Sequence, residues 1–192
     1  MSGVVSVFTT LCWIALALYW VVSARSVKPV EEQEIPAGRL RHVPLLVISF
    51  VLLFAFDHAT PVYPFSIVLL PRSIGTGIAG AVACVLGLAG ALWARRTLAG
   101  NWSGAVTFKK GHELIQNGPY RFVRHPIYTS ILLMFLGTAF AIGRLAGFLG
   151  LAILLVAYWT KLRREETLMA RHFPAEYAAY RKRVKALIPF VL

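Results

Sequence analysis

Nearly all of the side chains that could do chemistry stand in two polar stretches, which a long apolar run separates. The first stretch covers residues 111–128 and contains two motifs, Gly111-His112-Glu113-Leu114-Ile115 and Gly118-Pro119-Tyr120-Arg121-Phe122-Val123-Arg124-His125-Pro126-Ile127-Tyr128. The second covers residues 161–166 and reads Lys161-Leu162-Arg163-Arg164-Glu165-Glu166. Together the two stretches contain imidazole and carboxylate groups, which commonly carry protons in enzymes.

The first stretch also has the features of an anion-binding helix start. A helix that begins near Pro126 offers unpaired backbone N–H groups and the positive end of its dipole, which favour a carboxylate or a phosphate. Cationic donors surround this point, and they are Arg121, Arg124 and His125. Flat surfaces for an aromatic base or for a cation come from Tyr120, Phe122 and Tyr128.

The second stretch offers the opposite charge. Glu165 and Glu166 suit an ammonium or a sulfonium group. A zwitterion that carries a nucleoside would satisfy the cationic, anionic and aromatic groups together. No metal ligand set is expected, because Cys12 and Cys84 lie inside apolar runs and form no CxxC pair.

Each of these groups also has a simpler interpretation. Arg121 and Arg124 could contact lipid phosphate, and the tyrosines could be ordinary interfacial aromatics. Glu165 could be solvated and paired with Lys161, four residues before it on a helix. The dipeptide at residues 57–58, Asp57-His58, fits an outer-interface position better than a functional one.

The composition predicts that membrane-spanning helices position these residues. Of the 192 residues, 58% are hydrophobic and only 15% are charged, against about 25% charged in soluble domains. Val4–Val22 alone would form a helix of ~28 Å, enough to cross the hydrocarbon core. The expected spans are Val4–Val22, Val43–Phe56, Ile74–Ala94, Ile127–Ile142 and Leu145–Thr160. The predicted fold is therefore an all-α, polytopic membrane bundle of about five transmembrane helices, followed by a C-terminal helix in the cytoplasm.

The basic residues predict the orientation of this bundle. The net charge is +12, and 18 of the 20 Lys and Arg residues fall in the alternate segments 23–42, 95–126 and 161–192. The positive-inside rule places these segments in the cytoplasm and the N-terminus outside the cell or plasma membrane. Because the charge lies between apolar runs, membrane lipid is the expected partner and nucleic acid is not.

The last two apolar runs predict that the two polar stretches meet. Gly143-Arg144 is a joint so short that the runs on either side must form an antiparallel helical hairpin. The end of the second helix then lies beside the start of the first. This geometry brings His125 and Tyr128 near Glu165 at the cytoplasmic mouth of the bundle.

The combined motif resembles the isoprenylcysteine carboxyl methyltransferase family. The resemblance rests on Gly118-Pro119-Tyr120 and Arg124-His125-Pro126-Ile127-Tyr128, followed about 37 residues later by Glu165-Glu166 and then by Phe173-Pro174-Ala175-Glu176-Tyr177-Ala178-Ala179-Tyr180. It covers about residues 95–192, and residues 1–94 match only in being hydrophobic. We therefore expect two regions, N-terminal transmembrane helices at 1–94 and a methyltransferase-like region at 95–192.

The resemblance implies that S-adenosylmethionine is the cofactor. The family's cofactor contacts correspond to His112, Glu113, Leu114, Ile115, Tyr120, His125, Pro126, Ile127, Tyr128 and Glu165. The sequence has no strand–GxGxxG–helix unit of the kind that binds nucleotides in soluble domains. If the cofactor binds, it must bind in a helical membrane site.

The resemblance also implies where the methyl acceptor binds. The family's substrate-side arginine falls on Lys161, which lacks the planar two-pronged donor of arginine. Arg164 and Arg124 are further candidates for binding the substrate, and Arg163 is an alternative to Arg164. A carboxylate acceptor is already ionised at pH 7, whereas an amine or hydroxyl acceptor needs a base such as His125 or Glu165.

Several functions remain open at this level. The first is a membrane methyltransferase acting on a prenylated-cysteine carboxylate or another lipid-like acceptor, and a phospholipid or amine acceptor is an alternative. A channel or transporter is disfavoured, because the five runs carry almost no charge in their interiors. A non-enzymatic membrane scaffold subunit predicts no affinity for the cofactor.

Overall fold

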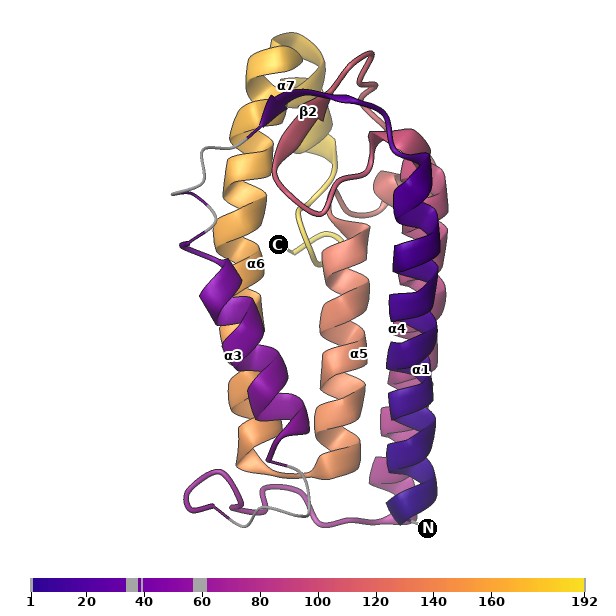
Figure 1. Cartoon of the computed structure of the whole chain (residues 1–192), viewed down its shortest axis with the longest axis vertical. Helices are drawn as coiled ribbons and strands as arrows, with labels where there is room; N and C mark the ends of the chain where they lie inside the picture. Colours follow the sequence, from indigo (N-terminus) through magenta and orange to yellow (C-terminus); the bar gives the residue numbers. More distant parts are fainter. Residues whose placement is uncertain (1, 34–37, 39, 57–61, 192) are drawn as a thin grey trace.

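The computed structural model describes residues 2–33, 38, 40–56 and 62–191, and its main body is an upright bundle of helices (Figure 1). The bundle is built from α1 (Ser2–Ser23), α3 (Val43–Phe54), α4 (Ile74–Leu98), α5 (Pro126–Ile142) and α6 (Leu145–His172). α1, α4 and α6 are each long and apolar enough to cross a membrane, whereas α3 and α5 are apolar but shorter. The polytopic membrane fold is thus confirmed, and a count of five spans stays a prediction.

The second helix of the hairpin, α6, extends beyond the predicted apolar run Leu145–Thr160. α6 continues without interruption from Leu145 to His172, so Lys161 and Glu165 belong to the last apolar helix and not to a separate tail. The residues after Thr160 are mostly strong helix formers, and nothing breaks the helix before Pro174. Pro174 then begins the short helix α7 (Pro174–Arg183).

The opposite end of the bundle is closed by a tight turn and a loop. Gly143 joins α5 to α6 with a φ of 71°, and a Cβ there would collide with the carbonyl oxygen of Leu70. Leu69 and Leu70 donate backbone hydrogen bonds to Gly143, so residues 62–72 form a loop under the hairpin and do not extend α3. Asp57 and His58 lie outside the described residues.

α4 and α5 pack closely because small residues line their contact. A Cβ on Gly80 would lie 2.5 Å from the Gly137 carbonyl oxygen, and one on Gly87 would lie 2.6 Å from the Ser130 carbonyl oxygen. Backbones therefore approach each other along this seam, as in many membrane helix pairs. α3 packs mainly on α6, where Gly150 faces the Ser49 carbonyl.

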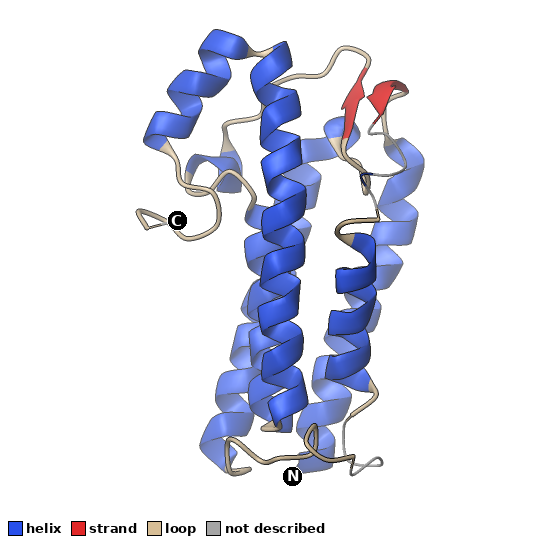
Figure 2. Cartoon of the chain, turned by 90° about the vertical axis from the view of Figure 1, so that its left-hand side faces the viewer, coloured by secondary structure: helices blue, strands red, loops and turns tan. Residues whose placement is uncertain are grey.

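The end of the bundle that carries the N-terminus of α5 holds the described parts of the three predicted basic segments, among them residues 23–33, 95–126 and 161–191 (Figure 1). Figure 2 shows the same end from a second side. A small antiparallel sheet lies there, in which β1 (Val30–Gln33) pairs with β2 (Thr107–Lys109). The sequence did not predict this sheet, because strands of three and four residues leave no clear alternating pattern. Three short 3-10 turns complete the connections, η1 (Ala24–Ser26), η2 (Ala99–Asn101) and η3 (Gly118–Arg121).

Candidate functional site

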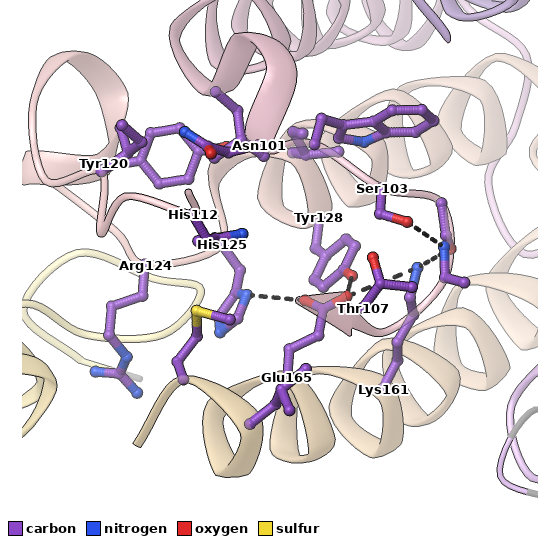
Figure 3. Close-up of a pocket in the computed structure, with 18 of the residues that line it drawn as sticks. Asn101, Ser103, Thr107, His112, Tyr120, Arg124, His125, Tyr128, Lys161 and Glu165 are labelled. Carbon is purple, nitrogen blue, oxygen red and sulfur yellow. Dashed lines mark hydrogen bonds and ion pairs between the residues drawn. The ribbon is translucent and has the colours of Figure 1, made fainter. Parts of the chain in front are cut away.

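A cavity of about 330 Å³ lies at the basic end of the bundle, within the size range of small-molecule sites (Figure 3). α5 and α6 supply part of its wall, and the connection between α4 and α5 supplies most of the rest. Further lining comes from Trp20 of α1, Leu46 of α3, Leu98 of α4, and Tyr177 and Tyr180 of α7. Both halves of the chain therefore build the site, and a division of the chain at residue 94 stays a prediction.

The carboxylate of Glu165 is the polar centre of the cavity. Its Oε1 accepts a 2.6 Å hydrogen bond from the Tyr128 hydroxyl, and its Oε2 lies 3.6 Å from His125 Nδ1. Lys161 Nζ lies 3.9 Å from Glu165 Oε1, one helical turn away on α6 (Figure 3). The predicted meeting of the His-Pro helix start with the glutamates is thus confirmed.

The neighbouring carboxylate, Glu166, shares His125 with Glu165 but pairs mainly with Arg124. Its Oε1 accepts hydrogen bonds from Arg124 Nε at 2.9 Å and Nη2 at 2.6 Å, and lies 3.2 Å from His125 Nε2. The Glu166 side chain is only 5% exposed and that of Arg124 8%. His125 therefore stands between the two glutamates, with one ring nitrogen facing each.

Arg124 also fixes the segment that follows α7. Its Nη1 donates hydrogen bonds to the carbonyl oxygens of Val184 and Arg181. These contacts, together with Glu166, engage the guanidinium away from the centre of the cavity (Figure 3). A role for Arg124 in holding substrate stays a prediction, and its observed contacts are structural.

Stacked rings form one wall of the cavity. Tyr128 lies between His125, whose ring centroid is 5.5 Å away, and Tyr158, whose centroid is 4.4 Å away. Lys161 Nζ lies 5.3 Å from the centre of the Tyr128 ring. This stacking restricts the orientation of the Tyr128 side chain and holds its hydroxyl toward Glu165.

The opposite wall comes from residues 101–115. Lys161 Nζ donates a 2.8 Å hydrogen bond to the carbonyl oxygen of Gly104, which ties this wall to α6. Thr107 lines the cavity, and its side-chain oxygen is buried and has no hydrogen-bond partner among the described residues. Most buried hydroxyl groups in proteins have such a partner.

Lys28, from the connection after α1, holds this wall in place. Its ammonium donates to Asn101 Oδ1 at 3.1 Å and to the carbonyl oxygen of Gly111 at 2.6 Å, and it pairs with Glu113 at 3.5 Å. The Glu113 N–H donates to the same Asn101 oxygen at 3.4 Å. One lysine and one buried asparagine therefore set the path of the loop that carries His112 and Glu113.

His112 is held neutral in this wall. Burial, followed by the nearby charge of Lys28, lowers its pKa to about 4. Its ring stacks on Phe108 at 4.9 Å, and His172 stacks on Phe108 at 3.6 Å. Glu32 of β1 accepts from Arg171 and contacts His172, both at 2.8 Å, so β1 links the wall to the end of α6.

Tyr120 closes the site near the end of α4. Burial, followed by the charge of Glu165, raises the pKa of its phenol well above the usual value, so the group stays protonated. Its hydroxyl donates to the Ala94 carbonyl at 3.4 Å. The Tyr180 hydroxyl of α7 donates to the Tyr120 carbonyl at 2.6 Å.

Most of the predicted site residues come together in the cavity. Of the predicted cofactor residues, those that line it are His112, Glu113, Leu114, Ile115, Tyr120, His125, Ile127, Tyr128 and Glu165. Pro126 is buried as the first residue of α5 and does not line the cavity. Of the predicted substrate residues, Lys161 and Arg124 line it and Arg164 does not. The roles of all these residues stay predictions.

Sequence reasoning missed several lining residues, which are Trp20, Leu46, Asn101, Thr107, Tyr158, Tyr177 and Tyr180. Tyr158 could have been found, because it precedes Lys161 by one helical turn and shares its face. Trp20 and Leu46 carried no signal beyond hydrophobicity.

The fold and the site define a class of polytopic membrane protein that builds its cavity from helix ends and connecting loops. The phospholipid methyltransferase family model matches residues 76–176, more than half of the chain. The chain belongs to this family. The match begins inside α4 and ends inside α7.

Individual relatives agree with this membership. The chain is 31% identical over 83 residues to "Protein-S-isoprenylcysteine O-methyltransferase" of Schizosaccharomyces pombe, which covers 43% of this chain and 35% of that protein. It is 33% identical over 112 residues to "Cobalt-zinc-cadmium resistance protein CzcN" of Cupriavidus metallidurans, which covers 57% of this chain and 47% of that protein. The chain thus spans less than half the length of these two relatives.

A solved structure shares the fold. It is the eukaryotic intramembrane Ras methyltransferase ICMT, an isoprenylcysteine carboxyl methyltransferase, with a TM-score of 0.54 and 26% identity. The match covers 79% of this chain and 53% of that one. The resemblance noted in the sequence is therefore confirmed, and the protein is an integral membrane protein.

Proposed function

We propose that the protein is an integral membrane methyltransferase that uses S-adenosylmethionine and acts on a lipid-like acceptor. The single observation that carries the proposal is the Glu165 carboxylate, oriented by Tyr128 and His125 inside a cavity lined by aromatic rings. This arrangement offers a fixed negative charge beside flat surfaces. A nucleoside that carries an ammonium and a sulfonium needs both.

The residues present fit this cofactor. Glu165 suits its positive charge, and Tyr120 and Tyr128 offer surface to an aromatic base. Asn101, Ser103 and Thr107 add polar side chains to the lining, which suit the polar groups of a nucleoside. When bound, S-adenosylmethionine supplies an electrophilic methyl carbon attached to a positively charged sulfur.

The chain's own contribution is to orient the reactants and exclude water. Methyl transfer from a sulfonium depends on alignment and a dry pocket more than on acid–base groups. The aromatic stack around Tyr128 and the apolar Leu168 provide a wall of this kind. A carboxylate acceptor would need no base, whereas an amine or a hydroxyl would use His125, which touches both glutamates.

The lining on the membrane side supports a lipid-like acceptor. Trp20, Leu46 and Ile131 bring apolar surface to the cavity from three different helices. Lys161 favours an acceptor with an acidic head group. An ammonium has three N–H donors, and the described residues give Lys161 two close polar partners, the Gly104 carbonyl and the Glu165 carboxylate. A third donor is then available to the acceptor. A prenylated-cysteine carboxylate has both features, and two of the proteins similar to this chain are named for acting on isoprenylcysteine.

We also propose that the cavity faces the cytoplasm. The three segments 23–42, 95–126 and 161–192 carry 18 of the 20 Lys and Arg residues, and their described parts lie at the cavity end of the bundle (Figure 1). The positive-inside rule assigns that end to the cytoplasm. The N-terminus then lies outside the cell membrane.

A transfer assay tests the proposed function. The full chain in lipid nanodiscs would be incubated with S-adenosylmethionine carrying a tritiated methyl group, together with either a farnesylated cysteine derivative or phosphatidylethanolamine. We expect label in the farnesylated carboxylate and its release by mild base, as for a methyl ester. Label in phosphatidylethanolamine alone would overturn the acidic acceptor, and no label in either lipid would overturn the lipid-like acceptor.

A further inference from the structure

The segment after α7, residues 184–191, turns back and packs against the start of α5. Arg124 N donates to the Lys185 carbonyl at 2.8 Å, and His125 N donates to the Ala186 carbonyl at 3.0 Å. The Thr129 hydroxyl donates to the Leu187 carbonyl at 2.7 Å. Ala186 and Leu187 are buried, so these contacts fix the position of the side chains that follow them.

Those following side chains are apolar and exposed. Phe190 is 93% exposed, Val191 72% and Ile188 50%. Phe190 has the highest exposure of any large hydrophobic residue in the described part of the chain. Apolar side chains that are held outward in this way mark a surface that contacts something other than water.

The place of this segment in the fold indicates what it contacts. Figure 2 shows the C-terminal end projecting sideways from the bundle, and the contacts with Arg124, His125 and Thr129 place the segment at the start of α5. The helices of the bundle continue past that level as apolar spans with exposed lipid-type side chains, such as Ile78 and Val82 of α4. The projection therefore lies beside the region where the spans leave the hydrocarbon core.

The charges next to the segment complement an anionic lipid surface. Residues 177–191 contain four basic residues and no acidic residue. The four are exposed, and they are Arg181, Lys182, Arg183 and Lys185. A basic cluster next to apolar side chains is the pattern of interfacial membrane attachment, in which headgroup phosphates meet the cations and acyl chains meet the apolar groups.

We propose that residues 184–191 form an interfacial membrane anchor. Ile188, Phe190 and Val191 insert at the boundary between headgroups and acyl chains of the adjacent leaflet, and the basic residues 181–185 bind anionic lipid phosphates. Because Arg124 and His125 hydrogen-bond to the same segment, the anchor joins the wall of the cavity to the lipid surface. The anchor does not depend on the proposed methyltransferase function.

Membrane depth measured by electron paramagnetic resonance tests the anchor. A nitroxide would be attached at position 190 in the variant F190C, with the full chain in nanodiscs that contain anionic phosphatidylglycerol. We expect more collisions with oxygen, which concentrates in lipid, than with a water-soluble nickel chelate. The unsubstituted protein measures any background label on the buried Cys12 and Cys84.

Two reference positions calibrate the depth. E176C on α7, which lies outside the basic residues 181–185, gives the value for an exposed position in water, and V51C on α3 gives the value for an exposed position on an apolar helix. A nitroxide at 190 that matches position 176 overturns the anchor, as would shallow values in both F190C and a second variant, I188C.

Changing the lipid charge tests the binding of anionic phosphates separately from the insertion of the apolar side chains. Nanodiscs of phosphatidylcholine alone, or the double substitution K182Q/K185Q in anionic nanodiscs, should each make position 190 more accessible to the nickel chelate by at least about twofold. An unchanged depth in both experiments would overturn the binding of anionic phosphates. A position 190 that becomes buried only when cell extract is added would identify a protein partner and overturn the lipid anchor.

Discussion

The hydroxyl of Tyr128 donates a 2.6 Å hydrogen bond to the carboxylate of Glu165, and this bond joins α5 to α6 beside the cavity. His125 and Lys161 approach the same carboxylate from two other directions. Glu165 is thus oriented before any ligand arrives, because packing and neighbouring hydrogen bonds fix its rotamer. Its neighbour Glu166 is equally polar, but its buried ion pair with Arg124 stabilises the fold. Substitutions at the two positions test this difference in role.

Substituting Glu166 with Gln should destabilise the protein much more than substituting Glu165 with Gln. Glu166 and Arg124 form a buried, hydrogen-bonded ion pair, and removing one charge leaves the other without compensation. The expected loss is about 3 kcal/mol in the free energy of unfolding. Equilibrium unfolding of both variants in detergent measures it, and equal losses at the two positions would contradict the assignment.

Substituting Lys28 with Met should weaken cofactor binding although Lys28 does not line the cavity. The lysine holds Asn101 and the Gly111 carbonyl, and with them the loop that carries His112 and Glu113. Losing a charged hydrogen bond of this kind corresponds to an affinity lower by about tenfold.

The matched control for Lys28 is Arg25→Met, a basic residue exposed on the same connection. We expect Arg25→Met to bind S-adenosylhomocysteine, the demethylated product, as the unsubstituted protein does. If Lys28→Met and Arg25→Met bound S-adenosylhomocysteine with equal affinity, the prediction would be contradicted, because the loop would then keep its position without Lys28.

Substituting Gly87 with Ala should destabilise the packing of α4 on α5. The new Cβ would lie 2.6 Å from both Met134 Cγ and the Ser130 carbonyl oxygen, so the helices would have to separate. Overpacking of this kind costs about 1–3 kcal/mol. The control is Gly75→Ala on the same helix, where the nearest atom is Ser73 Oγ at 3.6 Å, and thermal unfolding should separate the two variants.

Some of this arrangement followed from the sequence, because it depends on chain geometry alone. Apolar runs of fixed length predicted the helices, and the two-residue joint at Gly143 predicted the hairpin that brings Tyr128 to Glu165. Residue type and spacing alone did not separate the roles of Glu165 and Glu166, and only the family resemblance singled out Glu165. The two side chains differ in their contacts because adjacent residues on a helix point in directions about 100° apart. Which of the two faces the cavity depends on where α6 contacts α5.

Other features could not be read from the sequence for physical reasons. The last apolar run ends at Thr160, yet the polar residues beyond it are good helix formers and α6 continues to His172. Trp20 reaches the cavity through tertiary packing of α1, which no local pattern records. The β1–β2 pairing joins residues about 75 apart and is set by the fold around it.

The stability of the protein should fall as the pH is lowered from about 6.5 to about 4, in part because of His112. Its pKa is about 4 in the folded chain, where burial and Lys28 oppose the charged form, and about 6.5 in an unfolded chain. Between these values the unfolded chain binds a proton that the folded chain does not, so stability rises with pH. Thermal unfolding of His112→Gln should show a shallower pH dependence over this window, and an unchanged slope would contradict the assignment.

The most direct test of the account is calorimetric titration of S-adenosylhomocysteine into the detergent-purified protein and into its Glu165→Gln variant. We predict one binding site in the unsubstituted protein. In the variant, affinity should be at least about 30-fold lower, as expected when one partner of a buried charge pair is removed. The absence of binding heat in the unsubstituted protein, or an unchanged affinity in Glu165→Gln, would contradict the claim that this carboxylate holds the cofactor.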